Sequence, residues 1–173
     1  MSGMLRALYP GSFDPPSNGH MNIIHRISGI YDEIDVVVAT NPEKQYTFDA
    51  TERLDLMRTV CEPYENVQVY QWDRLIVEFA EKVGARVMIR GVRALSDFEY
   101  EFELSMINKG LNPRIETIFM PTDPKYFVLR SSAIKELARL DGDISRMVPA
   151  VVAERLKEKI RAGSRSRRRL GEG

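Results

Sequence analysis

A turn rich in glycine, serine and proline is the feature of this sequence that most directly suggests chemistry. It reads Tyr9-Pro-Gly-Ser-Phe-Asp-Pro-Pro-Ser-Asn-Gly-His20 and follows the first strand-like apolar run. Gly11 lets the backbone approach a ligand closely, while Ser12 supplies a hydroxyl and an N–H. Gly19 is expected to open a helix, whose first N–H groups attract phosphate, and His20 can donate a hydrogen bond there. The alternative is a plain turn that His20 caps.

Three cationic residues are expected at the same edge of the molecule. Lys44 follows the second apolar strand, and Arg90 and Arg93 flank a glycine at the end of the fourth. In an open parallel sheet, ligands bind beyond the carboxyl ends of the strands. Two forked guanidinium groups and one mobile ammonium suit two phosphate groups that repel each other. The alternatives are a solvated lysine and salt bridges from the arginines to Glu99 or Glu101.

The phosphate-binding turn resembles the nucleotidylyltransferase superfamily, in which a His-x-Gly-His or Thr-x-Gly-His motif follows strand one. Ser17 stands at the first position of that motif, and the Gly19-His20 pair is intact. The resemblance covers about Leu5 to Ile160 and is greatest to the members of coenzyme A synthesis. It implies transfer of the adenylyl group of ATP to 4'-phosphopantetheine, which yields dephospho-coenzyme A and pyrophosphate. The attack would be in line and without a covalent intermediate.

The resemblance also implies roles for individual residues. The catalytic group is His20, Lys44 and Arg93. The phosphopantetheine site is Ser12, Lys44, Leu75, Ile76 and Arg90. The ATP site is Ser12, Phe13, His20, Gly91, Val92, Arg93, Glu101, Tyr126, Phe127, Val128, Leu129, Arg130, Ser131 and Ser132.

Some of these residues have a simpler interpretation. Leu75 and Ile76 are equally explained as the buried face of a helix, and Ser131 and Ser132 as helix N-caps. Arg130 stands where the family has a serine. His20 is expected to act as a hydrogen-bond donor and not as a base, because a phosphate nucleophile is already ionised near neutral pH.

The elements that must position these residues follow an alternating pattern. Strand-like runs occur near residues 5–8, 34–39, 67–70, 87–89 and 115–120, with helical spacing between most of them. This predicts an α/β fold with a Rossmann-like, doubly wound, five-stranded parallel sheet and a C-terminal helix. One domain is expected at 1–162, followed by a basic, flexible tail at 163–173. Capping boxes at Asp49/Glu52 and Ser96/Glu99 predict helices from about Ala50 and Asp97, and others are expected near 133–140 and 149–162.

Composition excludes several classes of protein. The 25 basic and 25 acidic residues cancel, so no overall field favours nucleic acid or a membrane surface. Cys61 is the single cysteine, which excludes an internal disulfide. No run approaches the ~20 apolar residues of a membrane span, and the first residues show no signal-peptide pattern. A cytoplasmic location is therefore expected.

Cofactor and partners follow from the resemblance. Mg²⁺ is expected to enter with ATP, with no metal site made by the protein alone. A homohexamer and inhibition by coenzyme A are implied as well. Three rival functions are left open: a nucleotidylyltransferase acting on nicotinamide mononucleotide or using CTP, a nucleotide-binding regulator without catalysis, and a nucleic-acid binder acting through the tail.

Overall fold

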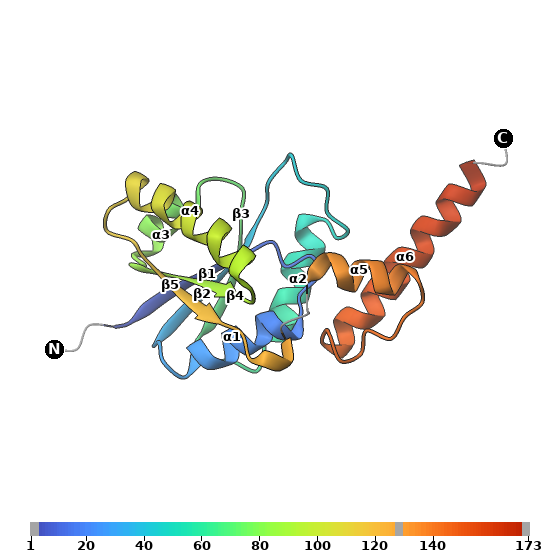
Figure 1. Ribbon diagram of the computed structural model, residues 1–173, viewed down its shortest axis with the longest axis horizontal. Helices are drawn as coiled ribbons and strands as arrows, with labels where there is room; N and C mark the ends of the chain where they lie inside the picture. The colour runs from blue at the N-terminus through green and yellow to red at the C-terminus, as the bar shows by residue number, and fades with distance from the viewer. Residues whose placement is uncertain (1–3, 127–129, 171–173) are drawn as a thin grey trace.

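A computed structural model of the chain describes residues 4–126 and 130–170, and side chains up to residue 163. Its elements alternate between strand and helix over most of the chain (Figure 1). They are β1 (Arg6–Gly11), α1 (Asn18–Ser28), β2 (Glu33–Ala39), α2 (Ala50–Cys61), β3 (Val67–Trp72), α3 (Ile76–Val83), β4 (Val87–Val92), α4 (Leu95–Leu111), β5 (Glu116–Pro121), a 3₁₀ turn at Pro124–Tyr126, α5 (Ser131–Arg139) and α6 (Ala150–Leu170).

The five strands form one parallel sheet in the order β3-β2-β1-β4-β5. This confirms the fold class predicted from the alternating pattern. Strand β1 lies at the centre, where both of its faces are covered, and the residues of its middle are all buried. A strand buried on both faces must be apolar along its whole length, which is why apolar and polar residues do not alternate there.

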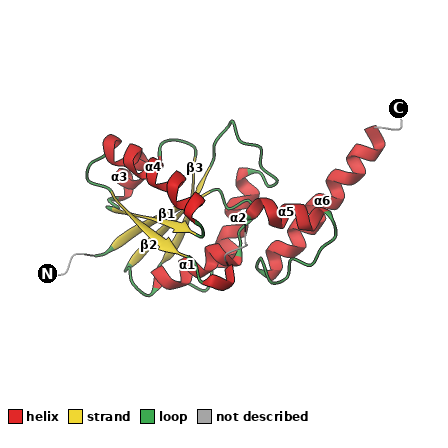
Figure 2. Ribbon diagram, in the orientation of Figure 1, coloured by secondary structure: helices red, strands yellow, loops and turns green. Residues whose placement is uncertain are grey.

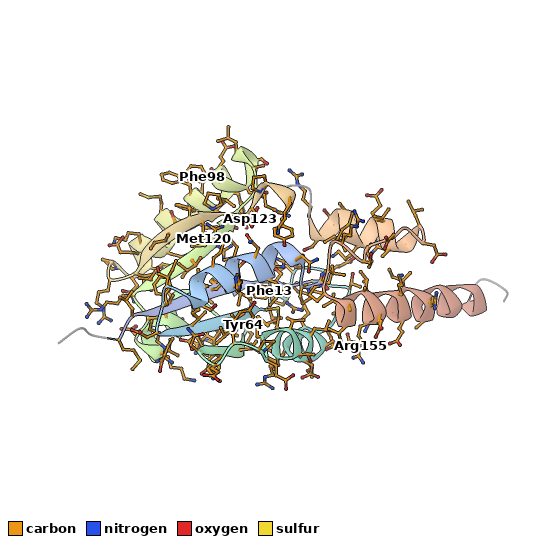
Figure 3. The ribbon with its side chains drawn as sticks, turned by 90° about the horizontal axis from the view of Figure 1, so that it is seen from below. Phe13, Tyr64, Phe98, Met120, Asp123 and Arg155 are labelled. Carbon is orange, nitrogen blue, oxygen red and sulfur yellow. The ribbon has the colours of Figure 1, made fainter. Side chains whose placement is uncertain are left out.

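Helices cover both faces of the sheet, as Figures 1 and 2 show with α1 below the strands and α3 and α4 above them. On one face, Ala7 and Tyr9 of β1 pack with α1 and α2. On the other face, Leu8 packs with α3. Helix α4 lies on this second face, because the Asn108 amide contacts the Met88 sulfur of that cluster. Figure 3 accordingly shows Phe98 of α4 and Tyr64, beside α2, on opposite sides of the molecule.

The position of the ligand cleft follows from this arrangement. Strand β1 leads into α1 on one face, and its neighbour β4 leads into α4 on the other. The loops that leave these adjacent strands therefore diverge and open a crevice at their carboxyl ends. This is the edge at which the phosphate-binding turn and the arginines were predicted.

A third cluster joins α5 and α6 to α2 through buried Phe48, Leu56 and Ile134. Helix α6 continues to Leu170, so the predicted helix end at Ala162 is wrong. A single glycine, Gly163, destabilises a helix only slightly, and the arginines that follow it have high helix propensity. The flexibility of the tail stays a prediction. In the described part of the chain, no helix has both the length and the apolar character that a bilayer span requires.

The helix starts agree with the sequence in part. Asp49 and Glu52 form the predicted capping box of α2. The box predicted at Ser96 and Glu99 is wrong, because α4 begins at Leu95 with Ala94 as its N-cap. The acidic Asp97 then occupies the third helical position, where it stabilises the positive helix end.

Candidate active site

A cavity of about 690 Å³ lies at the carboxyl edge of the sheet, within the size range of small-molecule sites. His20, Lys44, Arg90 and Arg93 all line it, although they come from α1, from the loop after β2, and from the end of β4 with the residue that follows it. Lining residues that the sequence predicted are Ser12, Phe13, His20, Lys44, Arg90, Gly91, Arg93, Glu101, Arg130, Ser131 and Ser132. The convergence of positive groups predicted from the sequence is therefore present.

His20 is held by a capping box at the start of α1. Ser17 is the N-cap: its hydroxyl accepts from the His20 backbone N–H, and its own N–H donates to His20 Nδ1 over 3.0 Å. A backbone N–H can only donate, so Nδ1 must be the acceptor and the neutral ring carries its proton on Nε2. Burial, and then the charge of Arg93, lower the pKa of His20 to about 4. The ring is thus a neutral donor.

Phe13 packs against the ring of His20. Its ring is buried and meets the His20 ring edge to face, with the centroids 5.0 Å apart. The backbone of Phe13 has φ 48°, a conformation that few residues other than glycine adopt. A Cβ at Gly11 would lie 2.9 Å from Cζ of this ring. The Phe13 ring therefore requires glycine at position 11, and the close approach of a ligand to Gly11 stays a prediction.

Arg90, within β4, and Arg93, directly after it, each pair with a carboxylate of α4. Arg90 grips Glu101 through Nε and Nη2, the latter at 2.7 Å, and donates from Nη1 to the Pro10 carbonyl over 3.0 Å. Arg93 Nε lies 3.0 Å from Asp97. The salt-bridge alternative is therefore correct for Arg90, while for Arg93 the partner is Asp97. Both arginines nevertheless line the cavity.

Lys44 reaches the cavity from the loop after β2. Its Nζ lies 3.4 Å from the Ser12 hydroxyl, which faces it across the mouth of the site. The lysine is exposed, as the solvated alternative expects, but it is not remote from the other cations.

Helix α5 closes another side of the cavity. Arg130 is its N-cap and makes no side-chain capping bond, so the alternative interpretation of Ser131 and Ser132 as helix N-caps is wrong. Both serines occupy the first turn and line the cavity. With no capping bond from the Arg130 side chain, the first N–H groups of α5 can bind an anion. Two helix starts, those of α1 and α5, border the cavity.

Residues 8–137 match the family described as cytidylyltransferase-like. The phosphopantetheine adenylyltransferase of Caldanaerobacter subterraneus subsp. tengcongensis is 48% identical over 155 residues, which cover 90% of this chain and 97% of that protein. The chain belongs to the phosphopantetheine adenylyltransferase family. This confirms the resemblance drawn from the sequence and the nucleotidyltransferase class of the enzyme.

Two further relatives agree. The phosphopantetheine adenylyltransferase of Streptomyces coelicolor is 44% identical over 158 residues, which cover 91% of this chain and 99% of that protein. A solved structure described as a nicotinate-nucleotide adenylyltransferase, from Vibrio parahaemolyticus, superposes with a TM-score of 0.67 at 20% identity. It covers 91% of this chain and 94% of its own, and it shows that the fold is shared.

Several residues predicted for this adenylyltransferase site do not line the cavity. Leu75 is an exposed residue just before α3, and Ile76 packs against the core on that face, so the helix-face interpretation fits Ile76 alone. The side chain of Val92 is buried. Tyr126 packs toward the α5–α6 cluster. Phe127, Val128 and Leu129 lie outside the described residues.

The enzyme also has supporting residues that the sequence analysis missed. Lys135 lines the cavity and lies 3.0 Å from buried Asp14, whose carboxylate also accepts from two backbone N–H groups. Its position four residues after Ser131 places it on the same face of α5, which was a usable signal. Arg53 of α2 is fully buried behind the cavity. Arg53 lies three and four residues before Leu56 and Met57, so helical spacing places it on the buried face of α2. The charge of the arginine hides this pattern, because a charged residue is expected on the exposed face.

The carboxylates at the adenylyltransferase cavity are already paired with cations. Asp14, Asp97 and Glu101 contact Lys135, Arg93 and Arg90, respectively. Within residues 4–126 and 130–170, no group of three or more histidine, cysteine, aspartate or glutamate side chains is placed to bind a metal.

Proposed function

We propose that this chain transfers the adenylyl group of ATP to 4'-phosphopantetheine and releases pyrophosphate. The observation that carries the proposal is the meeting of His20, Lys44, Arg90 and Arg93 at one cavity that two helix starts also border. Such a site neutralises two polyanions at once. Membership in the phosphopantetheine adenylyltransferase family supports the choice of substrates.

The reaction needs no protein nucleophile. A phosphate oxygen of 4'-phosphopantetheine forms a bond to the α-phosphorus of ATP, while the bond from that phosphorus to the β-bridging oxygen breaks. Pyrophosphate leaves with the electron pair, and dephospho-coenzyme A remains. Transfer of this kind requires alignment and compensation of developing charge. The Nε2–H of His20 would donate to the reacting phosphoryl group, whose charge grows toward the transition state.

The other cations divide between the two substrates. Lys44 and Ser12, 3.4 Å apart, would hold the attacking phosphate together with Arg90. Arg90 uses three of the five N–H donors of an arginine on Glu101 and Pro10, which leaves two for a ligand. Arg93, Arg130 and the start of α5 would bind the ATP phosphates. Glu101 would orient Arg90, and its contact with the nucleotide stays a prediction.

Magnesium enters this proposal with ATP. Its chemistry is to neutralise phosphate charge and to stabilise the leaving pyrophosphate. The paired carboxylates of the cavity fit a site in which the protein supplies cations and the nucleotide supplies the metal ligands. Coenzyme A is proposed as an inhibitor, because it contains both the pantetheine arm and the adenylate. A cytoplasmic location stays a prediction.

The homohexamer is also a proposal, and an unpartnered apolar face supports it. No residue of α4 is buried in the single chain, although the helix has 17 residues. Its large apolar side chains stand exposed, and together they form the apolar patch of α4. The members are Leu95, Phe98, Tyr100, Phe102, Met106, Ile107 and Leu111. Such a surface is typical of a contact with another protein.

The direct test is release of pyrophosphate with ATP, magnesium and one candidate acceptor at a time. 4'-Phosphopantetheine should support release, and dephospho-coenzyme A should appear in equal amount. Pantetheine, which lacks the attacking phosphate, is the matched control and should be inactive. Release only with nicotinamide mononucleotide, or only with CTP as the donor, would select a rival transferase. No release with any acceptor would favour a nucleotide-binding regulator.

A further inference from the structure

Arg53 connects the two segments that carry Ser12 and Lys44, although it does not line the cavity. It lies on α2 with 0% of its surface exposed. Its Nη1 donates to the Ser12 carbonyl over 2.7 Å and to the Ala39 carbonyl over 2.9 Å. One guanidinium nitrogen therefore joins the ends of the neighbouring strands β1 and β2.

The same side chain supports the loop that begins after β2. Its Nη2 donates to the Thr40 hydroxyl over 3.2 Å, and its planar group stacks on the Tyr46 ring, 3.9 Å from the centroid. The Tyr46 hydroxyl in turn accepts from the Asn41 N–H over 2.9 Å. Lys44 lies within this stretch, and its backbone N–H donates to the Asn41 carbonyl. The loop that presents Lys44 is thus built around Arg53.

Stability alone is a poor explanation for this arrangement. No carboxylate of the described residues lies within ion-pair distance of Arg53, and its Nε has no hydrogen-bond partner among them. A buried charge with an unsatisfied donor is costly, and apolar side chains of similar volume are often more stable at such positions. The guanidinium does what no apolar group can, because it fixes two carbonyls and a hydroxyl at set distances.

We propose that Arg53 is a positioning residue, which sets the distance between Lys44 and Ser12 so that the two hold one phosphate of the acceptor. The proposal rests on the proposed function for its kinetic consequence. Lysine cannot replace arginine here, because a single ammonium neither spans the three acceptors nor stacks as a plane on Tyr46.

The test begins with Arg53→Lys, and the matched control is Arg58→Lys on the exposed side of the same helix. R53K should lower kcat/KM for 4'-phosphopantetheine by about 10- to 100-fold, the cost of misplacing a catalytic group by about 1 Å. The KM for ATP should change little, because Arg93 and α5 are untouched. R58K should match the wild type in both parameters. Equal losses for both substrates in R53K would overturn the proposal.

A double-mutant cycle identifies the residue through which Arg53 acts. If it acts through Lys44, R53K should cost less than about threefold once Lys44→Met is already present. With Arg93→Met, which is carried by a different loop, the two losses should multiply. Losses that multiply in both backgrounds would show that R53K only loosens the fold. If R53K does not fold, Tyr46→Leu removes the stacking partner and enters the same cycle.

Hydrogen exchange separates this proposal from the proposed function. In R53K, amides of residues 40–46 should exchange faster than in R58K, with or without turnover. A wild-type enzyme that releases no pyrophosphate would refute the function but leave this readout intact. Unchanged exchange at 40–46 would refute the positioning role even in an active enzyme.

Discussion

The backbone N–H of Ser17 donates a hydrogen bond to Nδ1 of His20 over 3.0 Å. This single bond decides the chemistry of the ring, because it leaves the proton of the neutral imidazole on Nε2. The low pKa of His20, about 4, keeps the ring neutral through the physiological range. A neutral donor suits a reaction whose nucleophile is already an anion. Ser17 at the first position of the motif therefore fixes the tautomer and the position of His20. A small residue with a hydroxyl is sufficient for this role.

The state of His20 can be measured in the enzyme without substrates. The chain has two histidines, so His25→Gln leaves His20 as the only imidazole. Nitrogen-15 NMR of this variant should show Nδ1 as the unprotonated nitrogen at pH 7 and a titration midpoint near 4. Between that value and the unfolded pKa of about 6.5, the unfolded chain binds a proton that the folded chain does not. His20 should therefore make the fold less stable as the pH falls through this window. A midpoint near 6.5 would contradict the assigned environment.

Removing the imidazole should affect turnover more than binding. His20→Ala is expected to lower kcat by about 10²- to 10³-fold, as loss of one donor to a developing charge does. The KM values for ATP and 4'-phosphopantetheine should change much less, because the bond is strongest in the transition state. His25→Ala, on the exposed side of the same helix, is the control and should be fully active. Loss of affinity equal to the loss of turnover would show that His20 merely binds substrate.

Gly11 is predicted to be required for packing under the site. In Gly11→Ala the new Cβ meets the buried Phe13 ring at 2.9 Å, and the strained backbone of Phe13 gives the ring little room to move. The expected loss is about 1–3 kcal/mol of unfolding free energy. Thermal unfolding should detect it, at about 2–4 °C per kcal/mol. The control is Gly110→Ala on α4, where a Cβ meets nothing within 4 Å; it should be neutral or stabilising. Equal melting temperatures for the two variants would contradict the steric argument.

The sequence predicted the convergence of the cations because that depends only on the strands being parallel. Lys44, Arg90 and Arg93 lie at or just beyond the carboxyl ends of strands, and any parallel sheet brings such ends to one edge. The local starts of helices were less predictable. Ser96 and Glu99 have the same spacing as the capping box at Asp49 and Glu52, but α4 begins earlier, at Leu95, with Ala94 as its N-cap.

Other parts of the site depend on contacts that sequence spacing does not encode. The bond from Arg53 to the Ser12 carbonyl joins residues 41 positions apart, and the bond from Lys135 to Asp14 joins residues 121 apart. Leu75 matched a family position, but a residue before a helix start can be turned outward, and it is exposed here. Backbone geometry around Phe13 likewise has no sequence signature, because positive φ is rare for phenylalanine.

Arg90 should be irreplaceable by lysine. Arg90→Lys keeps the charge but loses the fork that grips Glu101 and the bond to the Pro10 carbonyl. The ammonium would then pair with Glu101 and withdraw from the phosphate, so kcat/KM for 4'-phosphopantetheine should fall by about 10- to 100-fold. Arg86→Lys, an exposed arginine before β4, is the matched control. Steady-state kinetics that show full activity for R90K would mean that a point charge is sufficient at this position.

The apolar face of α4 predicts how the chain assembles. If copies of the chain cover this face, the wild type should have a mass that is a multiple of 19.8 kDa, and the hexamer proposal requires six copies. Met106 and Ile107 are each 58% exposed within the patch, so paired substitution by lysine removes apolar contact and adds repelling charge without disturbing the core of one chain. Light scattering after size exclusion should show a smaller assembly for Met106→Lys/Ile107→Lys, with far-UV circular dichroism unchanged. Thr51→Lys, an exposed position on α2, should keep the wild-type mass. A wild type that is monomeric at micromolar concentration, or a double variant with the wild-type mass, would assign this face to some other partner.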